Sequence, residues 1–345
     1  MIDFKLIESL TNAPGVSGND GAVRKLIRAG IAKHVDDIRV DALGNLIAYK
    51  KPRGNKKGPK VLLAAHMDEI GLMVTFIDKL GYLKFGKVGG VDNRVLLAKR
   101  VLVGKDKVPG VIGVRPIHLI WRKGEHKKVS TPEELVIDIG ASNQEDAQKY
   151  VSIGDYVVFD TQYEDWGALI KAKAFDDRIG CYLMMELLKD RYDFPVYAAF
   201  TTQEEVGLRG ATTAAFGVSP DVGIAVDITG AFDTPDEKPK LPAVLGKGAA
   251  IKVKDGGMLA TPSVKQLMVA TAKANKIPYQ LDILEGGTTD GAAIYKTRSG
   301  IPTGVISVPT RYAHSPSEMV DMIDVQASVD LLVKLLELDL KKKLP

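Results

Sequence analysis

The feature that most constrains this chain is an apolar stretch that ends in two adjacent carboxylates. Residues 196–207 read V-Y-A-A-F-T-T-Q-E-E-V-G, so a run typical of buried parallel strands leads directly to Glu204 and Glu205. Neighbouring carboxylates repel each other, and close pairs normally persist only with a cation, a shared proton or ample water. The stretch indicates either a solvated turn between a strand and a helix or a cation site at the end of a buried strand.

The same arrangement recurs along the chain, where an apolar run leads to a side chain that can bind a metal. Residues 60–68 read K-V-L-L-A-A-H-M-D, and the histidine and the last aspartate lie on one face if the strand continues through them. Open α/β sheets bind ligands beyond the carboxyl ends of their strands, so we expect these groups to converge. Besides Glu205, the groups are His66, Asp68, Asp176, Asp227 and His314.

Length and composition restrict the class of protein. A chain of 345 residues with 45% hydrophobic and 26% charged residues is typical of a globular protein with two domains. The net charge of +4 is small and the basic residues are scattered, so we expect no nucleic-acid partner. The single cysteine, Cys181, fits a reducing cytoplasm. The first residues show no signal-peptide pattern, and no apolar run approaches the ~18 residues that span a bilayer, so we expect a cytoplasmic protein without a membrane partner.

Two patterns divide the chain. From residue 70 to about residue 161, short β-rich runs alternate with glycine and lysine turns, which is typical of a small barrel or sandwich. From residue 174 onward, helical and strand patterns alternate, which predicts a mainly parallel sheet covered by helices. We therefore expect an α/β fold in which a discontinuous domain, residues 1–69 and 166–345, is interrupted by a β-rich insert, residues 70–165.

The side chains at the strand ends suit a site for two metals. Imidazoles and carboxylates are the ligands expected for zinc or cobalt. Two such metals about 3.5–4 Å apart need a bridging carboxylate and about five protein ligands. Glu204, next to a ligand but free of metal, suits a base that takes a proton from water, and Asp68 suits a partner that orients His66. The five candidate ligands are His66, Asp176, Glu205, Asp227 and His314.

Two further segments are candidates for supporting roles. Residues 286–292 read G-G-T-T-D-G-A and form either a plain glycine turn or a loop in which Thr288, Thr289 or Asp290 contacts substrate. Asp177 and the neighbouring Arg178 are expected to form an ion pair that supports the segment of Asp176.

Six segments of the chain, in this order, resemble one known family. They read A-A-H-M-D-E-I-G at 64–71, K-A-F-D-D-R-I-G at 173–180, T-T-Q-E-E-V-G-L-R-G at 201–210, A-V-D at 225–227, G-G-T-T-D-G-A at 286–292 and P-T-R-Y-A-H-S-P-S-E at 309–318. The family is that of the tetrahedral, or TET, aminopeptidases, which are exopeptidases with two metals. The resemblance extends over essentially the whole chain. One departure is the T-T-D of the glycine-rich segment, where a single threonine is expected.

The resemblance implies a place for each ligand and a reaction. His66 and Asp227 would hold one metal, Glu205 and His314 would hold the other, and Asp176 would bridge them. The protein would be an aminopeptidase that removes N-terminal residues from peptides, with two divalent metal ions, zinc or cobalt, in each subunit.

The resemblance also implies roles for Glu204 and Asp68 and an assembly. Glu204 would activate a water that bridges the metals, and Asp68 would support His66 from behind. The fold would be zinc-peptidase-like, and its insert would be a small PDZ-like β-barrel that makes dimers. Such dimers would assemble into a hollow tetrahedral dodecamer.

Three other functions remain open at this point. Some relatives of the family are described as endoglucanases, although glycosidases need only two carboxylates and give no role to His66 and His314. A deacylase of amino-acid derivatives would use similar chemistry with two metals. A structural metal protein or scaffold would favour a closed site, commonly with cysteine ligands, and would not need a free Glu204. Acidic, basic, glycyl and apolar first residues of the substrate all remain open.

Overall fold

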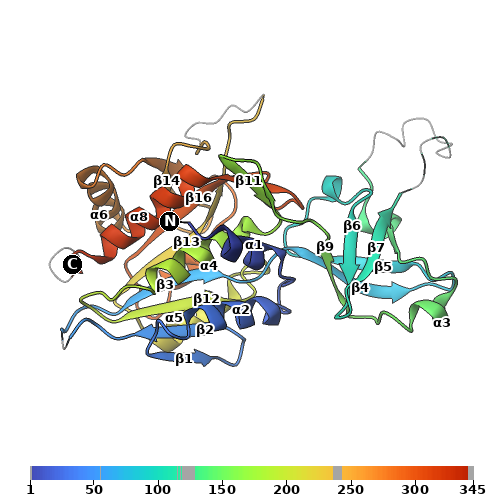
Figure 1. The fold of residues 1–345 in the computed structure, drawn as a ribbon, viewed down its shortest axis with the longest axis horizontal. Helices are drawn as coiled ribbons and strands as arrows, with labels where there is room; N and C mark the ends of the chain where they lie inside the picture. Colours follow the sequence, from blue (N-terminus) through green and yellow to red (C-terminus); the bar gives the residue numbers. More distant parts are fainter. Residues whose placement is uncertain are drawn as a thin grey trace.

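The structure of this chain is a computed structural model with two parts, a large α/β domain and a closed β-barrel. It describes residues 2–54, 56–114, 116, 118, 129–235 and 243–340. Figure 1 shows the barrel at one end of the molecule, joined to the edge of the large domain, with the C-terminus at the opposite end. The α/β class and the small β-barrel predicted from the sequence are both confirmed.

A mixed sheet forms the centre of the large domain. Its strands β12, β3, β13 and β16 are parallel neighbours, whereas the strands toward both edges are antiparallel, apart from the parallel pair β14 and β15. Only short turns join β1 to β2 and β16 to β17, which permits antiparallel pairing alone. In spatial order, the strands are β1 (Asp37–Val40), β2 (Leu46–Lys50), β12 (Val196–Thr201), β3 (Val61–His66), β13 (Val222–Gly230), β16 (Thr303–Arg311), β17 (Glu318–Asp321), β11 (Leu169–Ala172) and β10 (Glu164–Asp165), with β14 (Ala249–Lys254) beside β16 and β15 (Tyr279–Ile283) beyond it.

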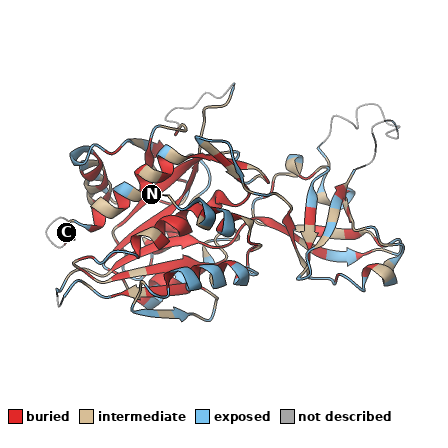
Figure 2. Ribbon diagram, viewed as in Figure 1, coloured by how far each residue is buried: buried red, intermediate tan, exposed pale blue. Residues whose placement is uncertain are grey.

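Helices cover both faces of this sheet. On one face lie α4 (Phe175–Leu187), α6 (Pro262–Ala274) and α8 (Met322–Leu336), with α1 (Phe4–Asn12) and α2 (Gly21–Ile31) packed against α4. On the other face lie α5 (Arg209–Val218) and α7 (Gly291–Ile294). Figure 2 shows the central strands as buried, and every residue of β3 is buried. This double cover explains why the central strands read as continuous apolar runs.

The starts of the helices follow from local sequence signals. The Asp321 carboxylate accepts a hydrogen bond from the backbone N–H of Ile323 at the start of α8, and Asp3 does the same for Leu6 in α1. Pro262 is the first residue of α6, where its missing N–H costs no helical hydrogen bond. These signals set where the helices begin, and burial of their apolar faces holds them on the sheet.

The barrel has its own hydrophobic core. Its strands close in the order β4 (Gly71–Ile77), β5 (Leu83–Val88), β8 (Val136–Asp138), β7 (Val108–Gly113), β6 (Arg100–Val103) and β9 (Tyr156–Phe159). Short helical turns η1 (Asn93–Val95), η4 (Pro132–Glu134) and α3 (Gln144–Ala147) lie between them. The barrel strands span residues 71–159, and β10 already belongs to the large sheet. The barrel is therefore inserted in the chain between β3 and β10 of the large domain.

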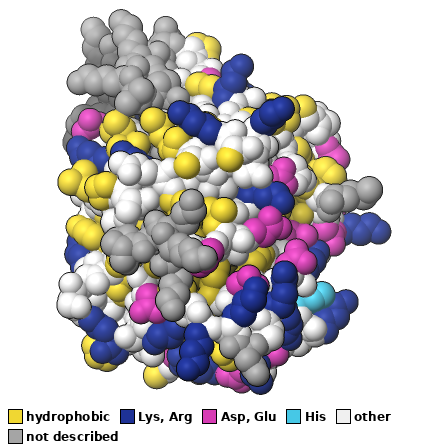
Figure 3. All heavy atoms as spheres, turned by 90° about the vertical axis from the view of Figure 1, so that its left-hand side faces the viewer, with side chains coloured by type: hydrophobic (Ala, Val, Ile, Leu, Met, Phe, Trp, Pro, Cys, Tyr) yellow, Lys and Arg dark blue, Asp and Glu magenta, His cyan; other side chains and the backbone are white. Residues whose placement is uncertain are grey.

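The surface carries charges of both signs. Figure 3 shows the end of the large domain remote from the barrel, where Lys and Arg side chains are interspersed with Asp and Glu. None of the helices in the described part of the chain is long and apolar enough to cross a membrane.

Candidate metal centre

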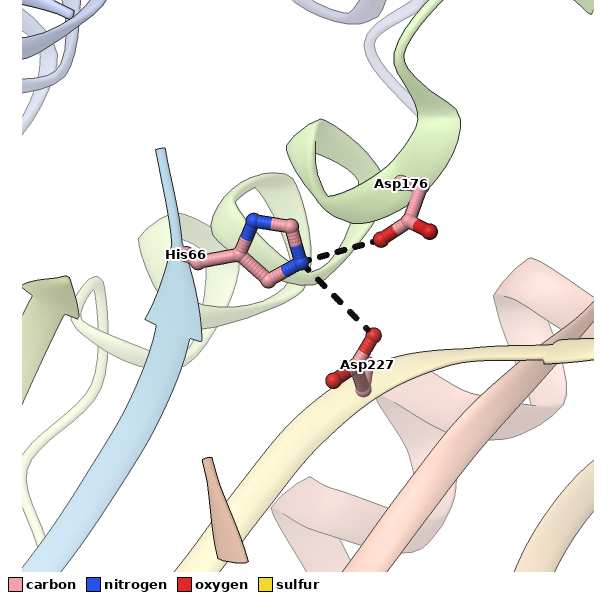
Figure 4. A group of neighbouring side chains, drawn as sticks. All are labelled: His66, Asp176 and Asp227. Carbon is pink, nitrogen blue, oxygen red and sulfur yellow. Dashed lines mark hydrogen bonds and ion pairs between the residues drawn. The ribbon is translucent and has the colours of Figure 1, made fainter. Parts of the chain in front are cut away.

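The first group of candidate ligands consists of His66, Asp176 and Asp227. The His66 Nε2 atom lies 2.9 Å from Asp176 Oδ1 and 4.0 Å from Asp227 Oδ1. Figure 4 shows the imidazole between the two carboxylates, which come from different elements of the large domain. All three side chains are at least nine-tenths buried. This arrangement can hold one metal ion with one nitrogen and two oxygen ligands.

The second group shares Asp176 with the first. The His314 Nε2 atom lies 3.3 Å from Asp176 Oδ2 and 3.6 Å from Glu205 Oε2. Asp176 thus directs Oδ1 to the first group and Oδ2 to the second. A carboxylate with one oxygen on each side is the geometry that a bridging ligand needs.

The parallel strands bring these groups to one edge of the sheet. His66 is the last residue of β3, and it pairs in register with Thr201, the last residue of β12. Glu205 follows in the turn after β12, as the apolar run indicated. Asp227 differs from the expectation, because β13 continues beyond it to Gly230. The longer strand arises because β13 stays paired with β16 as far as Gly230.

Each histidine is oriented by a backbone carbonyl. The Nδ1 atom of His66 lies 3.0 Å from the carbonyl oxygen of Asp68, and Nδ1 of His314 lies 3.1 Å from the carbonyl oxygen of Gly90. Because Nδ1 is engaged by a carbonyl, Nε2 is the atom of each ring that can bind a cation once it has lost its proton, as a metal ligand requires.

The carboxylate of Asp68 holds the turn that carries the two glutamates. Its Oδ1 accepts a hydrogen bond of 3.0 Å from the N–H of Glu204, and its Oδ2 accepts one of 3.3 Å from the N–H of Glu205. The hydroxyl of Ser17 also donates to Oδ2. The Asp68 Oδ1 atom lies 3.7 Å from His66 Nδ1, so the imidazole is oriented chiefly by the Asp68 backbone.

Glu204 lies beside the first group of ligands without being part of it. Its Oε2 atom is 3.9 Å from His66 Nε2, and its side chain is 10% exposed. Neither of the two ligand groups includes it. A carboxylate in this place can exchange protons with a molecule held between the two groups.

Two further carboxylates support the backbone of the centre, and the sequence-based prediction assigned no role to one of them, Glu318. Glu318, the first residue of β17, accepts hydrogen bonds of 3.1 Å from the backbone N–H groups of both Asp176 and His314. Asp177 accepts one of 3.1 Å from the N–H of His66, and the peptide bond between Asp176 and Asp177 is cis. Glu318 closes the segment 309–318, so its position four residues after His314 was the signal that could have indicated it.

The expected ion pair between Asp177 and Arg178 is wrong. Asp177 accepts its hydrogen bond at the end of β3, whereas the guanidinium of Arg178 donates to the carbonyl oxygens of Leu10 and Ala13. Arg178 Nη2 lies 3.3 Å from Glu69 Oε1. Two adjacent residues at this bend of the chain point in different directions, so each finds its own partner.

The three candidate residues of the glycine-rich loop each have a hydrogen-bond partner within the protein. Thr288 donates to Asp255 Oδ1 at 3.2 Å, and the buried Thr289 accepts a hydrogen bond from the N–H of Gly291. Asp290 accepts from the hydroxyl of Thr201, while its buried Oδ1 atom has no hydrogen-bond partner among the described residues. Of the three candidate substrate contacts, Asp290 is the one with an unused polar atom.

The sequence of this chain matches one protein family over most of its length. The family model for M42 glutamyl aminopeptidases matches residues 44–331. The chain belongs to the M42 family. It is therefore a peptidase, and the aminopeptidase function implied by the resemblance is supported at the level of the family.

Relatives of this M42 chain cover nearly its whole length. The lysyl aminopeptidase of Pyrococcus furiosus is 35% identical over 347 residues, which are 98% of this chain and 97% of that protein. The solved structure of the aminopeptidase APDkam598 from Desulfurococcus kamchatkensis is 40% identical, with a TM-score of 0.91 over 96% of this chain and 94% of that one. The TET1 peptidase of Pyrococcus horikoshii is 34% identical, with a TM-score of 0.85 over 96% and 98%. The expected membership of the tetrahedral aminopeptidases is confirmed.

Electrostatics favour cations in the centre of this M42 peptidase. Burial and the charge on Asp176 raise the pKa of Glu205 to about 8, and burial raises that of Asp227 to about 7. Burial also raises the pKa of Glu204 well above its ordinary value. The Glu205 Oε1 atom is buried without a hydrogen-bond partner in the described part of the chain. Imidazoles, ionisable carboxylates and an unsatisfied oxygen together fit divalent cations, which would relieve the repulsion.

We predict that metal binding releases protons and strengthens with pH. In the metal-free protein, Glu205 and Asp227 have pKa values raised above the ordinary ones, so both hold protons at low pH that a cation must displace. The affinity for zinc should therefore rise from about pH 6 to about pH 8, by up to about tenfold per pH unit for each proton released. Calorimetric titration in buffers of different ionisation enthalpy measures the protons released. An affinity that does not change over this range would contradict the prediction.

Proposed function

We propose that this chain is a metal-dependent aminopeptidase that uses two divalent cations, zinc or cobalt, to remove N-terminal residues from peptides. The observation that carries this proposal is the position of Asp176, whose two oxygens face two separate groups of histidine and carboxylate ligands. Such a pair of groups around one shared carboxylate is the arrangement of sites with two metals.

The ligands divide between the two cations. His66 and Asp227 would hold one cation, Glu205 and His314 the other, and Asp176 both. When bound, the cations would lower the pKa of a water molecule and polarise the scissile carbonyl. The distances of 2.9–4.0 Å between the ligand atoms leave them close enough to share these two ions.

We propose that Glu204 moves the proton in the reaction. It accepts a proton from the attacking water while the oxygen bonds to the carbonyl carbon, and it gives this proton to the leaving nitrogen when the C–N bond breaks. Its position near His66 Nε2 and outside both ligand groups supports this role. The hydrogen bond from its N–H to Asp68 fixes its backbone.

We infer that Asp290, rather than Thr288 or Thr289, contacts the substrate. Its unpartnered Oδ1 atom is buried, and its charge contributes to the raised pKa of Asp227, after burial and the other groups of the centre. A free α-ammonium group would find two acidic side chains here, Glu204 and Asp290, that are outside the ligand groups. A blocked amino group would lack this attraction.

The function is tested by hydrolysis of a panel of free and amino-blocked peptides, before and after chelation. We expect cleavage only of free amino termini, because only they carry the charge that the acidic centre attracts. Chelation should abolish the activity, and zinc or cobalt should restore it. Cleavage of blocked peptides or of acylated amino acids instead would favour the deacylase, and cleavage of glucans would favour the endoglucanase.

The Glu204→Gln variant in the same panel separates proton transfer from metal binding. It should keep both cations, because it removes no ligand, yet lose turnover by about 10²- to 10⁴-fold. Glu8→Gln, at an exposed position of α1, is the matched control and should keep full activity. Full activity of Glu204→Gln would refute the role of this carboxylate.

We propose that the domain of residues 70–165 makes dimers, which assemble into a tetrahedral dodecamer, while residues 1–69 and 166–345 form the catalytic domain. The TET1 peptidase of Pyrococcus horikoshii can assemble into a tetrahedron or a large octahedral shell, which supports an assembly here. Light scattering tests the assembly, and a monomer of 37.3 kDa would contradict it.

We also propose a cytoplasmic location, where the enzyme would act on peptides. The single cysteine supports this location.

A further inference from the structure

We propose that the Gly89–Gly90 turn of the barrel is a working part of the second ligand group and determines whether a cation binds there. This inference rests on the proposed two-metal function. The turn follows β5 and belongs to the barrel in sequence. It nevertheless lies against Glu205 and His314, the two ligands that the second group does not share with the first. The barrel would then contribute to catalysis as well as to assembly.

The two histidines differ in what orients them. His66 is 2% exposed, and its Nδ1 proton goes to the carbonyl of Asp68, two residues further along the same segment. His314 is 44% exposed, and its Nδ1 atom lies 3.1 Å from the carbonyl oxygen of Gly90, 224 residues away and outside the large domain. The first imidazole is therefore held by its own segment and by burial, whereas the second depends on the docking of the barrel.

The turn is also in steric contact with the second group. A Cβ atom added at Gly90 would lie 2.7 Å from His314 Nδ1 and 3.0 Å from its Cε1 atom. A Cβ atom added at Gly89 would lie 3.2 Å from the Cβ atom of Glu205. The backbone can approach both ligands this closely only because neither residue has a side chain.

The barrel fixes the position of this turn. The Nζ atom of Lys87, on β5, donates to the carbonyl oxygen of Val91 at 2.9 Å and to Asn93 Oδ1 at 3.0 Å. The Val91 side chain is buried in the barrel core. The turn therefore moves with the barrel, and a shift of the barrel relative to the large domain changes the direction of the His314 ring.

The expected effect is specific to one of the two cations. Partners that hold the second nitrogen of a metal-binding histidine are worth about 10- to 100-fold in metal affinity. Gly90→Ala keeps every ligand but pushes the His314 ring from its place. It should lower the affinity for the cation of Glu205 and His314 by about this factor. The affinity for the cation of His66 and Asp227 should stay almost unchanged, because no residue of the turn contacts that pair in the described structure.

The experiment is a titration of the metal-free protein with Co²⁺, in which binding is monitored by calorimetry and by the visible absorption of the bound ion. The wild-type protein should bind two equivalents, and Gly90→Ala should bind one with wild-type affinity and the other about 10- to 100-fold more weakly. The matched control is Gly86→Ala in β5, where the added Cβ would make only an ordinary contact of 3.5 Å with Thr75. It should bind both equivalents like the wild type.

A second variant keeps the test decisive if Gly90→Ala folds poorly. Lys87→Met replaces an exposed side chain and removes the two hydrogen bonds that hold the turn. It should lower the affinity for the same Co²⁺ equivalent, but to a smaller extent. Thermal unfolding of the metal-free variants verifies that each is folded. Wild-type binding of both equivalents in folded Gly90→Ala and Lys87→Met, or equal weakening of both, would overturn the inference. A single equivalent in the wild type would instead contradict the two-metal function and the inference with it.

Discussion

The interaction on which this structure depends is the sharing of one carboxylate, Asp176, between two histidines. Its oxygens lie 2.9 Å from His66 Nε2 and 3.3 Å from His314 Nε2. Three separated segments must be in place for this contact: the end of β3, the start of α4 and the turn before β17. Glu318 holds the last two together by accepting hydrogen bonds from the backbone N–H groups of Asp176 and His314. The parallel centre of the sheet serves this purpose, because it brings the carboxyl ends of distant strands to one edge.

The buried carboxyl groups of the centre repel each other when they are ionised, and the rest of the fold must offset this repulsion. Several buried carboxyl groups have raised pKa values there, among them Glu205 at about 8 and Asp227 at about 7. Hydrogen bonds from backbone N–H groups to Asp68, Asp177 and Glu318 stabilise the surrounding acidic side chains. Cations would remove the remaining repulsion, so metal binding should also stabilise the folded state. Glu204 and Asp290 belong to neither ligand group, so they would stay free of the cations and could attract a substrate with a free α-ammonium group.

Much of this fold could be predicted from the sequence, because its signals are local. Continuous apolar runs predicted the buried central strands, and a histidine or carboxylate after each run indicated one edge of the sheet. What could not be predicted depends on contacts between distant segments. The pairing of Arg178 with Glu69 instead of Asp177, the use of the Asp68 carboxylate for the turn of Glu204, and the carbonyl of Gly90 behind His314 are set by how the barrel and the helices dock. The extension of β13 past Asp227 likewise follows from its pairing with β16, which no local pattern shows.

The two ligand groups imply that Asp176 lies between two metal sites. Anomalous diffraction from crystals grown with Co²⁺, recorded at the cobalt absorption edge, tests it most directly. We expect two peaks about 3.5–4 Å apart, one between His66 and Asp227 and one between Glu205 and His314, with an oxygen of Asp176 directed at each. A single peak, or peaks that do not adjoin Asp176, would contradict it.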